Sequence, residues 1–191
     1  MKKFILPFLL LALTIFFHSC KTSTAGGTAT ATGMAVAVNN GNFAINGVSM
    51  ITPWSLTTCE KALGKADRSR DGYNITHTYD ELSVVLFEPK SGEKGGGIVS
   101  EIQFYFSFPP DPPSLAPKGL YKGNMKIGKL NVQADMTSAQ MRNGLKGWLE
   151  TDSYSEHNYR MSQKGLYVYF LFNDAETKLI KVSIGPDKTG K

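Results

Sequence analysis

The chain has 191 residues, of which 41% are hydrophobic and 19% charged, and its formal net charge is +5. This hydrophobic content is enough for one folded core, or two small ones, without a disulfide staple. The basic residues are scattered along the sequence rather than clustered, which argues against nucleic-acid binding.

The N-terminal segment has the form of a signal peptide. Two lysines at 2–3 precede an apolar run at 4–17, which is shorter than the roughly 18 residues of a membrane-spanning helix. The run ends in the sequence FHSC at 17–20, which resembles a bacterial lipobox. The resemblance implies that residues 1–19 are removed and that Cys20 carries lipid. The alternative is an ordinary secreted protein in which Cys20 is a chance thiol.

A lipidated Cys20 would anchor the protein stably, because more than one acyl chain is attached. No acidic run follows Cys20, so the favoured location is the cell envelope, at the outer membrane and facing the periplasm. Loss of the leader would lower the net charge from +5 to +3. Cys59 is the only other cysteine, so lipidation of Cys20 leaves no intramolecular disulfide.

Residues 20–42 are predicted to be a lipidated terminus and a flexible linker. Thr, Ala and Gly dominate 21–33, and such a stretch buries too little apolar surface to offset its ordering entropy. Residues 34–38 fit either a weak strand or a continuation of the linker. About 20 flexible residues would reach about 25 Å from the membrane.

The first repeat is predicted at 43–108. The dipeptide Asn46-Gly47 favours a tight hairpin turn within 43–51. Thr57 and Glu60 have the spacing of a capping box, which predicts a short helix that Gly64 ends. Alternating or apolar runs then predict three strands, at 73–79, 82–87 and 98–106.

A proline-rich connector, 109–119, separates this repeat from a second one at 120–185. The second repeat contains a possible hairpin at 124–129 and another capping box, formed by Thr137 and Gln140. Strands are predicted at three ranges, followed by a frayed tail at 186–191. These ranges are 154–161, 166–172 and 178–184.

Both repeats show the order strand, capped helix and three strands, and 81–87 aligns with 165–171. The expected fold is α+β, with antiparallel sheet and helices on one face; the two repeats could pack their sheets together or continue one sheet. This order resembles the β-lactamase-inhibitor-protein-like fold, which small outer-membrane assembly lipoproteins share. Gly64, the run 79–82 and the run 121–123 also resemble a family of uncharacterised bacterial domains. These motifs are structural, so the resemblance implies a fold and transfers no functional residue.

Candidate catalytic and metal-binding groups are weak. Cys59 lies on the apolar face of its helix, where a structural thiol is the default and a nucleophile would need a nearby histidine. His77, His157, Glu156 and Asp80 are metal-ligand types without ligand spacing, so no metal site or cofactor is predicted. Asp80-Glu81 fits a turn, and the glycine-rich loop 92–97 lacks a Gly-Lys-Ser/Thr ending and fits a hairpin loop.

Tyrosines on the strands are the more informative feature. Tyr73, Tyr79, Tyr167 and Tyr169 lie on predicted strands, where several of the tyrosines alternate with polar residues. Tyrosine combines contact area with a polar tip that suits a recognition face. Equally, half-buried sheet faces use tyrosine for packing. The sequence favours a lipid-anchored, non-enzymatic module that binds a protein or envelope ligand through these tyrosines. The alternative is a hydrolase that acts on a cell-wall or lipid substrate.

Overall fold

The computed structural model describes residues 33–91, 94–108, 111–151 and 156–187. The expected leader, Cys20 and most of the expected linker lie outside these residues. Within them the fold consists of strands and two short helices, α1 (Leu56–Leu63) and α2 (Ser138–Gly144). No helix in the described part of the chain is long and apolar enough to cross a membrane.

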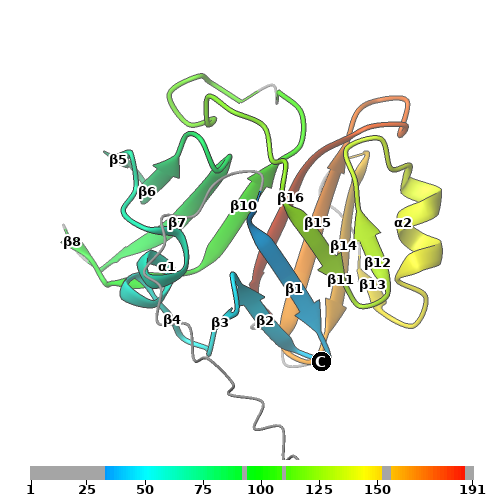
Figure 1. Cartoon of the computed structure of the whole chain (residues 1–191), viewed down its shortest axis with the longest axis horizontal. Helices are drawn as coiled ribbons and strands as arrows, with labels where there is room; N and C mark the ends of the chain where they lie inside the picture. The colour runs from blue at the N-terminus through cyan, green and yellow to red at the C-terminus, as the bar shows by residue number, and fades with distance from the viewer. Residues whose placement is uncertain (1–32, 92–93, 109–110, 152–155, 188–191) are drawn as a thin grey trace, which may run out of the picture.

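The strands form a five-stranded sheet, a nine-stranded sheet and one short pair (Figure 1). The five-stranded sheet has the order β12 (Leu130–Val132), β11 (Asn124–Ile127), β1 (Ala35–Asn39), β2 (Asn42–Ile45) and β3 (Val48–Ser49). The nine-stranded sheet has the order β13 (Leu149–Thr151), β14 (Asn158–Gln163), β15 (Leu166–Phe172), β16 (Leu179–Pro186), β10 (Glu101–Tyr105), β7 (Val84–Ser91), β6 (Asn74–Tyr79) and β5 (Arg68–Asp71), with β8 (Lys94–Gly95) beside β7. The short pair joins β4 (Trp54–Ser55) to β9 (Ile98–Val99).

One hydrophobic core lies between the two large sheets. Along β15, Leu166, Val168 and Phe170 belong to this core, whereas the residues between them are half-buried. Successive side chains of a strand point to opposite faces, so only one face of the nine-stranded sheet contacts the core. From the five-stranded sheet, Val36 and Ile127 enter the same cluster. Figure 1 shows the five-stranded sheet in front of the larger one.

The α+β expectation, with helices covering one face of an antiparallel sheet, is wrong. The second layer is itself a sheet, and the helices contact its edge strands: α1 contacts β3, and also β4 of the short pair, and α2 contacts β12. The five-stranded sheet is also not purely antiparallel, because β1 pairs in parallel with β11. Rather than the three strands expected after each helix, α1 is followed by five strands of the nine-stranded sheet (β5, β6, β7, β8 and β10) and α2 by four (β13 to β16).

The helix caps were predicted with mixed success. The capping box of Thr137 and Gln140 is present, and Gly64 ends α1 with a φ of 86°. The predicted capping box at Thr57 is wrong, because Ser55 is the N-cap and its hydroxyl accepts from the Thr58 N–H at 3.1 Å. The hairpin turn at Asn46-Gly47 is confirmed, and both residues have positive φ.

Strand β1 is central to the five-stranded sheet, between β2 and β11. The segment expected at 34–38 is therefore a strand, Ala35–Asn39, rather than a continuation of the linker, and the expected linker does not extend to residue 42. The alternating burial of Ala35–Asn39 explains this position, because Val36 and Val38 enter the core while the alanines point outward.

Four pairs of equivalent elements in the two halves begin 82 positions apart. This offset separates β2 from β11, β3 from β12, α1 from α2, and β7 from β15. In each large sheet, equivalent strands of the two halves therefore lie at equal distances from the centre. Strand β1 is at the centre of the five-stranded sheet, and the β10–β16 pair is at the centre of the nine-stranded sheet. The predicted alignment of 81–87 with 165–171 has an offset of 84, two positions more than the structural offset. Because side chains alternate along a strand, this difference keeps each residue on the correct face but pairs it with a residue two positions away from its true equivalent.

Candidate functional site

The face of the nine-stranded sheet that points away from the core is named here the outer face. On β10 it carries Glu101, Gln103 and Tyr105, and on β15 it carries Tyr167 and Tyr169. A face that does not contact the main core would ordinarily be polar and solvated. Here it is rich in aromatic and hydrogen-bonding side chains, so it is the candidate recognition surface.

The proline-rich connector covers the first half of the outer face. Ala116 packs against Val85 and Tyr105, and Phe87 lies beside this small cluster. Asp111, at the start of the described part of the connector, forms an ion pair with Lys181 at 3.1 Å. The connector is therefore part of the fold, and it occupies the outer surface of β7 and β10.

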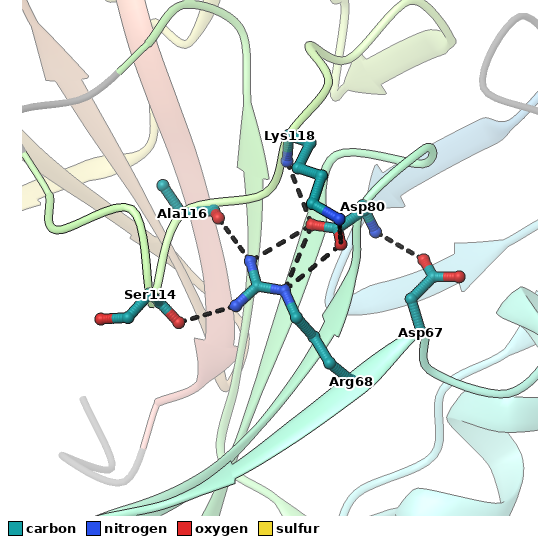
Figure 2. Close-up of polar contacts among 6 residues, drawn as sticks. All are labelled: Asp67, Arg68, Asp80, Ser114, Ala116 and Lys118. Atoms are coloured by element: carbon teal, nitrogen blue, oxygen red, sulfur yellow. Dashed lines mark hydrogen bonds and ion pairs between the residues drawn. The ribbon is translucent and has the colours of Figure 1, made fainter.

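Arg68 and Asp80 hold the connector in place (Figure 2). The Arg68 guanidinium donates to the carbonyl oxygens of Ser114 at 2.7 Å and Ala116 at 2.6 Å. It also forms an ion pair with Asp80 at 3.2 Å, and Asp80 in turn accepts from the Lys118 backbone N–H at 3.1 Å. The two side chains thus satisfy backbone groups on both sides of the connector's contact with the sheet.

Asp80 remains ionised in this cluster. Its burial acts to raise the carboxyl pKa. Hydrogen bonds from the Arg68 side chain and the Lys118 backbone N–H, together with the positive charges of the Arg68 and Lys118 side chains, lower the pKa below its ordinary value. The sequence interpretation of Asp80 as a turn residue missed this role. Only the fold brings Arg68, twelve positions earlier, and the connector to the same carboxylate.

The second half of the outer face has a connected network centred on Tyr167. The Tyr167 hydroxyl donates to Glu101 at 2.7 Å, and the Arg160 guanidinium lies 4.7 Å from the Tyr167 ring centroid. Glu101 also accepts from Gln103 at 2.6 Å, and Arg160 forms an ion pair with Asp187 at 3.0 Å. Burial first, and then the Glu101 charge, raise the Tyr167 pKa, so this hydroxyl stays protonated and able to donate.

Tyr169 lies next to this network. Its ring is perpendicular to that of Tyr167, with centroids 6.0 Å apart. It also lines a hollow of about 250 Å³ on the outer face. The other residues of this hollow are Glu101, Asn158, Leu171, Lys181 and Ser183. This hollow mixes both charge signs, hydroxyls and an aromatic ring, a composition that suits polar recognition rather than an apolar ligand.

The structure brings together two of the four predicted tyrosines. Tyr167 and Tyr169 are neighbours, but Tyr73 is 96% exposed at the β5–β6 turn, in the other half of the sheet. Tyr79 belongs to the core, where it is 2% exposed and its hydroxyl donates to the Gly64 carbonyl at 3.2 Å. The prediction of Tyr79 as a contact residue is therefore wrong. Period-two alternation cannot say which face of a strand is covered.

The two histidines of the possible metal set bind different carboxylates. His77 pairs with Glu88 at 2.7 Å, and His157 pairs with Glu176 at 3.1 Å. Asp80 belongs to the connector cluster described above. Within the described residues no group of three or more His, Cys, Asp and Glu side chains could hold a metal ion.

Glu176 fastens the start of α2 to the sheet. It accepts hydrogen bonds from the hydroxyls of Ser138 and Tyr159 and from His157. These bonds, with that of Ser138 the largest contribution, lower the Glu176 pKa to about 2. Ser138 is buried and donates to the carboxylate rather than to a histidine, so this cluster is a structural cap and lacks the geometry of an activated nucleophile.

Cys59 is fully buried on α1. Burial, and to a smaller degree the nearby Glu60 charge, raise the pKa of its thiol to about 12. A thiol in this environment stays neutral and behaves as a small apolar side chain. This geometry fits the structural interpretation of Cys59.

These surfaces define a mostly β, two-sheet protein with an aromatic outer face. Residues 35–142 match a family described as a domain of unknown function (DUF7738), and because the match covers more than half of the chain, the protein belongs to this family. A comparison with curated proteins finds no match.

Solved structures give distant likenesses. A cysteine-rich secretory protein from Staphylococcus aureus subsp. aureus Mu50 is 9% identical, with a TM-score of 0.41 over 70% of this chain and 42% of that chain. An extracellular protein containing an SCP domain, from Bacillus anthracis str. Ames, is 10% identical, with a TM-score of 0.44 over 71% of this chain and 44% of that chain. The chain therefore spans less than half the length of these structures, and no site residue is transferred from them.

Proposed function

We propose that the protein is a lipid-anchored, non-enzymatic module of the cell envelope that binds a partner protein through the second half of the outer face. The observation that carries this proposal is the cluster of Tyr167, Tyr169, Arg160 and Glu101 on a sheet face outside the core. Aromatic and Arg side chains supply most of the energy in protein interfaces, and the network holds these groups in place before a partner arrives.

The covered half of the outer face indicates what kind of partner fits. Val85 and Phe87 of β7 are the equivalents, at the 82-position offset, of Tyr167 and Tyr169 of β15. The first pair packs beneath the connector, a proline-containing loop with a turn at 113–115, two of whose carbonyls accept from Arg68. A loop of another protein, lying across the tyrosine pair, is the corresponding occupant of the second half. This argument favours a protein over the other envelope ligands.

Site-specific photo-crosslinking in cells would test the surface. A photoreactive residue in place of Tyr169 or Leu171 should capture one partner, and the same residue in place of Tyr73 should not. With the partner purified, Tyr169→Ala should cost about 2 kcal/mol of binding free energy, as interface anchors do. Tyr73→Ala is the matched control, because it removes an exposed tyrosine from the other half. Equal capture at all three positions would contradict the proposal.

The anchor is tested separately. Cys20 ends an apolar leader-like run, so Cys20→Ser should abolish labelling by a palmitate analogue and release the protein from the membrane fraction. The Cys59→Ser variant serves as the control, since a buried thiol should not contribute to labelling. Equal labelling of the parent and the Cys20→Ser variant would refute the proposed lipid anchor and would leave the outer-face proposal unaffected.

One observation favours a second candidate, the hydrolase. Ser69, His77 and Glu88 lie on adjacent strands β5, β6 and β7, with the Ser69 hydroxyl 3.0 Å from His77 Nδ1 and His77 Nε2 2.7 Å from Glu88. Glu88 is 4% exposed and also accepts from the Gly97 N–H at 2.6 Å, so it is well placed to orient the imidazole. Ser69 itself is exposed.

A fluorophosphonate probe would decide this question. Labelling that is lost in Ser69→Ala and in His77→Gln, but kept in Ser49→Ala, a control that removes an exposed serine from strand β3, would support a serine nucleophile activated by His77. Absence of labelling in the parent protein would refute the hydrolase. In that case the three side chains serve as cross-strand polar pairs.

A further inference from the structure

A cavity of about 520 Å³ opens at one end of the sandwich. The β1–β2 turn and the β14–β15 turn meet there so closely that a Cβ on Gly41 would lie 2.6 Å from the Lys164 carbonyl oxygen. Residues of both halves line the cavity, and the β4–β9 pair forms one wall. They are Gly41, Thr52, Pro53, Trp54, Pro89, Ile98, Val99, Ser100, Lys164, Gly165, Leu166, Pro186 and Asp187.

The walls of this cavity are mainly apolar. Trp54 is completely buried and packs its ring against Phe43 at a centroid distance of 4.9 Å, so it forms part of the inner wall. Ile98, which lines the opening, is 40% exposed, and Ile51, next to the lining residue Thr52, is 77% exposed. Large apolar side chains that face solvent beside an apolar cavity mark a binding site for an apolar group.

The charge at the opening is positive. Lys164 is exposed, and among the described residues it forms no ion pair. Asp187, the acidic lining residue, is paired with Arg160 at 3.0 Å, and its side chain is only 6% exposed. An anionic ligand would thus meet the Lys164 ammonium group without facing an uncompensated carboxylate.

We propose that this cavity binds a fatty acid, with the hydrocarbon chain against Ile98, above the buried Trp54, and the carboxylate at Lys164. The volume lies within the range of about 300 to 1,000 Å³ that is usual for small-ligand sites. The apolar walls match an acyl chain, and the single uncompensated charge at the opening matches a carboxylate. The site is distinct from the outer face and does not depend on the function proposed for it.

Tryptophan fluorescence would test the proposal. Trp148→Phe leaves Trp54 as the sole tryptophan of the full chain. Titration with ω-bromododecanoic acid should quench Trp54 emission saturably, because the bromine at the chain end would lie near the inner wall. Unbrominated dodecanoate should compete and restore the emission. Quenching that rises linearly without saturation would overturn the proposal.

Substitutions at the opening would show whether the fatty acid binds in this cavity. Lys164→Gln should weaken binding of the acid about three- to fivefold, as loss of an exposed charge pair does, and should leave binding of the methyl ester unchanged. Ile98→Glu places a negative charge on the lining and should abolish saturable quenching. Leu149→Glu is the matched control, since Leu149 is 51% exposed on a different strand. Equal quenching in the Ile98→Glu and Leu149→Glu variants, with thermal midpoints unchanged, would place binding outside this cavity and refute the assignment.

Discussion

Gly185 determines whether Tyr167 can occupy its place in the outer-face network. The two residues lie directly opposite each other on β16 and β15, and a Cβ on Gly185 would be 2.4 Å from the Tyr167 ring carbon Cζ and hydroxyl oxygen. Atoms cannot approach so closely, so Gly185→Ala must displace the ring. Displacement breaks the hydrogen bond to Glu101 and removes the contact with Arg160.

The loss of stability in Gly185→Ala can be worked out from these contacts. A hydrogen bond to a charged group contributes about 1.5–3 kcal/mol, and a partly exposed cation–π contact about 0.5–1 kcal/mol. Replacing glycine within a strand recovers about 0.5–1 kcal/mol of chain entropy. We therefore expect Gly185→Ala to lower the free energy of unfolding by about 2 kcal/mol, which corresponds to a thermal midpoint lower by about 4–8 °C for a chain of this size.

Thermal unfolding followed by circular dichroism would measure the effect. Gly72→Ala is the matched control, because its Cβ would meet only the Asn74 carbonyl, at 3.5 Å. In a Tyr167→Phe background, Gly185→Ala should cost less, since the hydrogen bond to Glu101 is already absent. A midpoint for Gly185→Ala equal to that of Gly72→Ala, or an equal cost in both backgrounds, would refute the reasoning.

Two further predictions concern the carboxylate clusters. Asp80→Asn should destabilise the fold by about 2 kcal/mol and make the connector at 111–118 susceptible to proteases, because Arg68 and the Lys118 N–H lose a charged acceptor; an unchanged cleavage pattern and urea midpoint would contradict this. The Glu176 pKa is lowered from 4.5 to about 2, chiefly by the Ser138 hydroxyl, so its stabilising contribution is present above about pH 4.5 and is lost as the pH falls to about 2. Glu176→Gln should therefore show a flatter dependence of the thermal midpoint on pH across this window than the parent protein; parallel curves would exclude the assigned role.

The prediction of individual elements succeeded where a local pattern is sufficient. The Asn46-Gly47 hairpin and the Thr137 capping box depend on backbone conformations and hydrogen bonds within a few residues, so the residue types alone indicate them. The Thr57 error arose from local ambiguity, because Ser55 and Thr57 are both good N-cap residues and only the entry of the chain from β4 selects Ser55. The resemblance to the β-lactamase-inhibitor-protein-like fold stays a prediction.

The sequence by itself determined the apolar run at 4–17 that precedes Cys20, the positions of the strongest strands and the presence of tyrosines on them. Tertiary structure alone decided which tyrosines form a surface. Tyr79 and Tyr167 were both predicted as contact residues, yet α1 and the core cover the first, whereas the second faces away from the core and meets Glu101, 66 positions earlier. Which face of a strand is covered, and which residue a tyrosine contacts, depend on how the sheets stack and where the connector lies. These are contacts between distant segments, and no local sequence pattern contains them. For the same reason the weak pattern at 34–38 became the central strand of a sheet, because two neighbouring strands supply the pairing that its own residues do not specify.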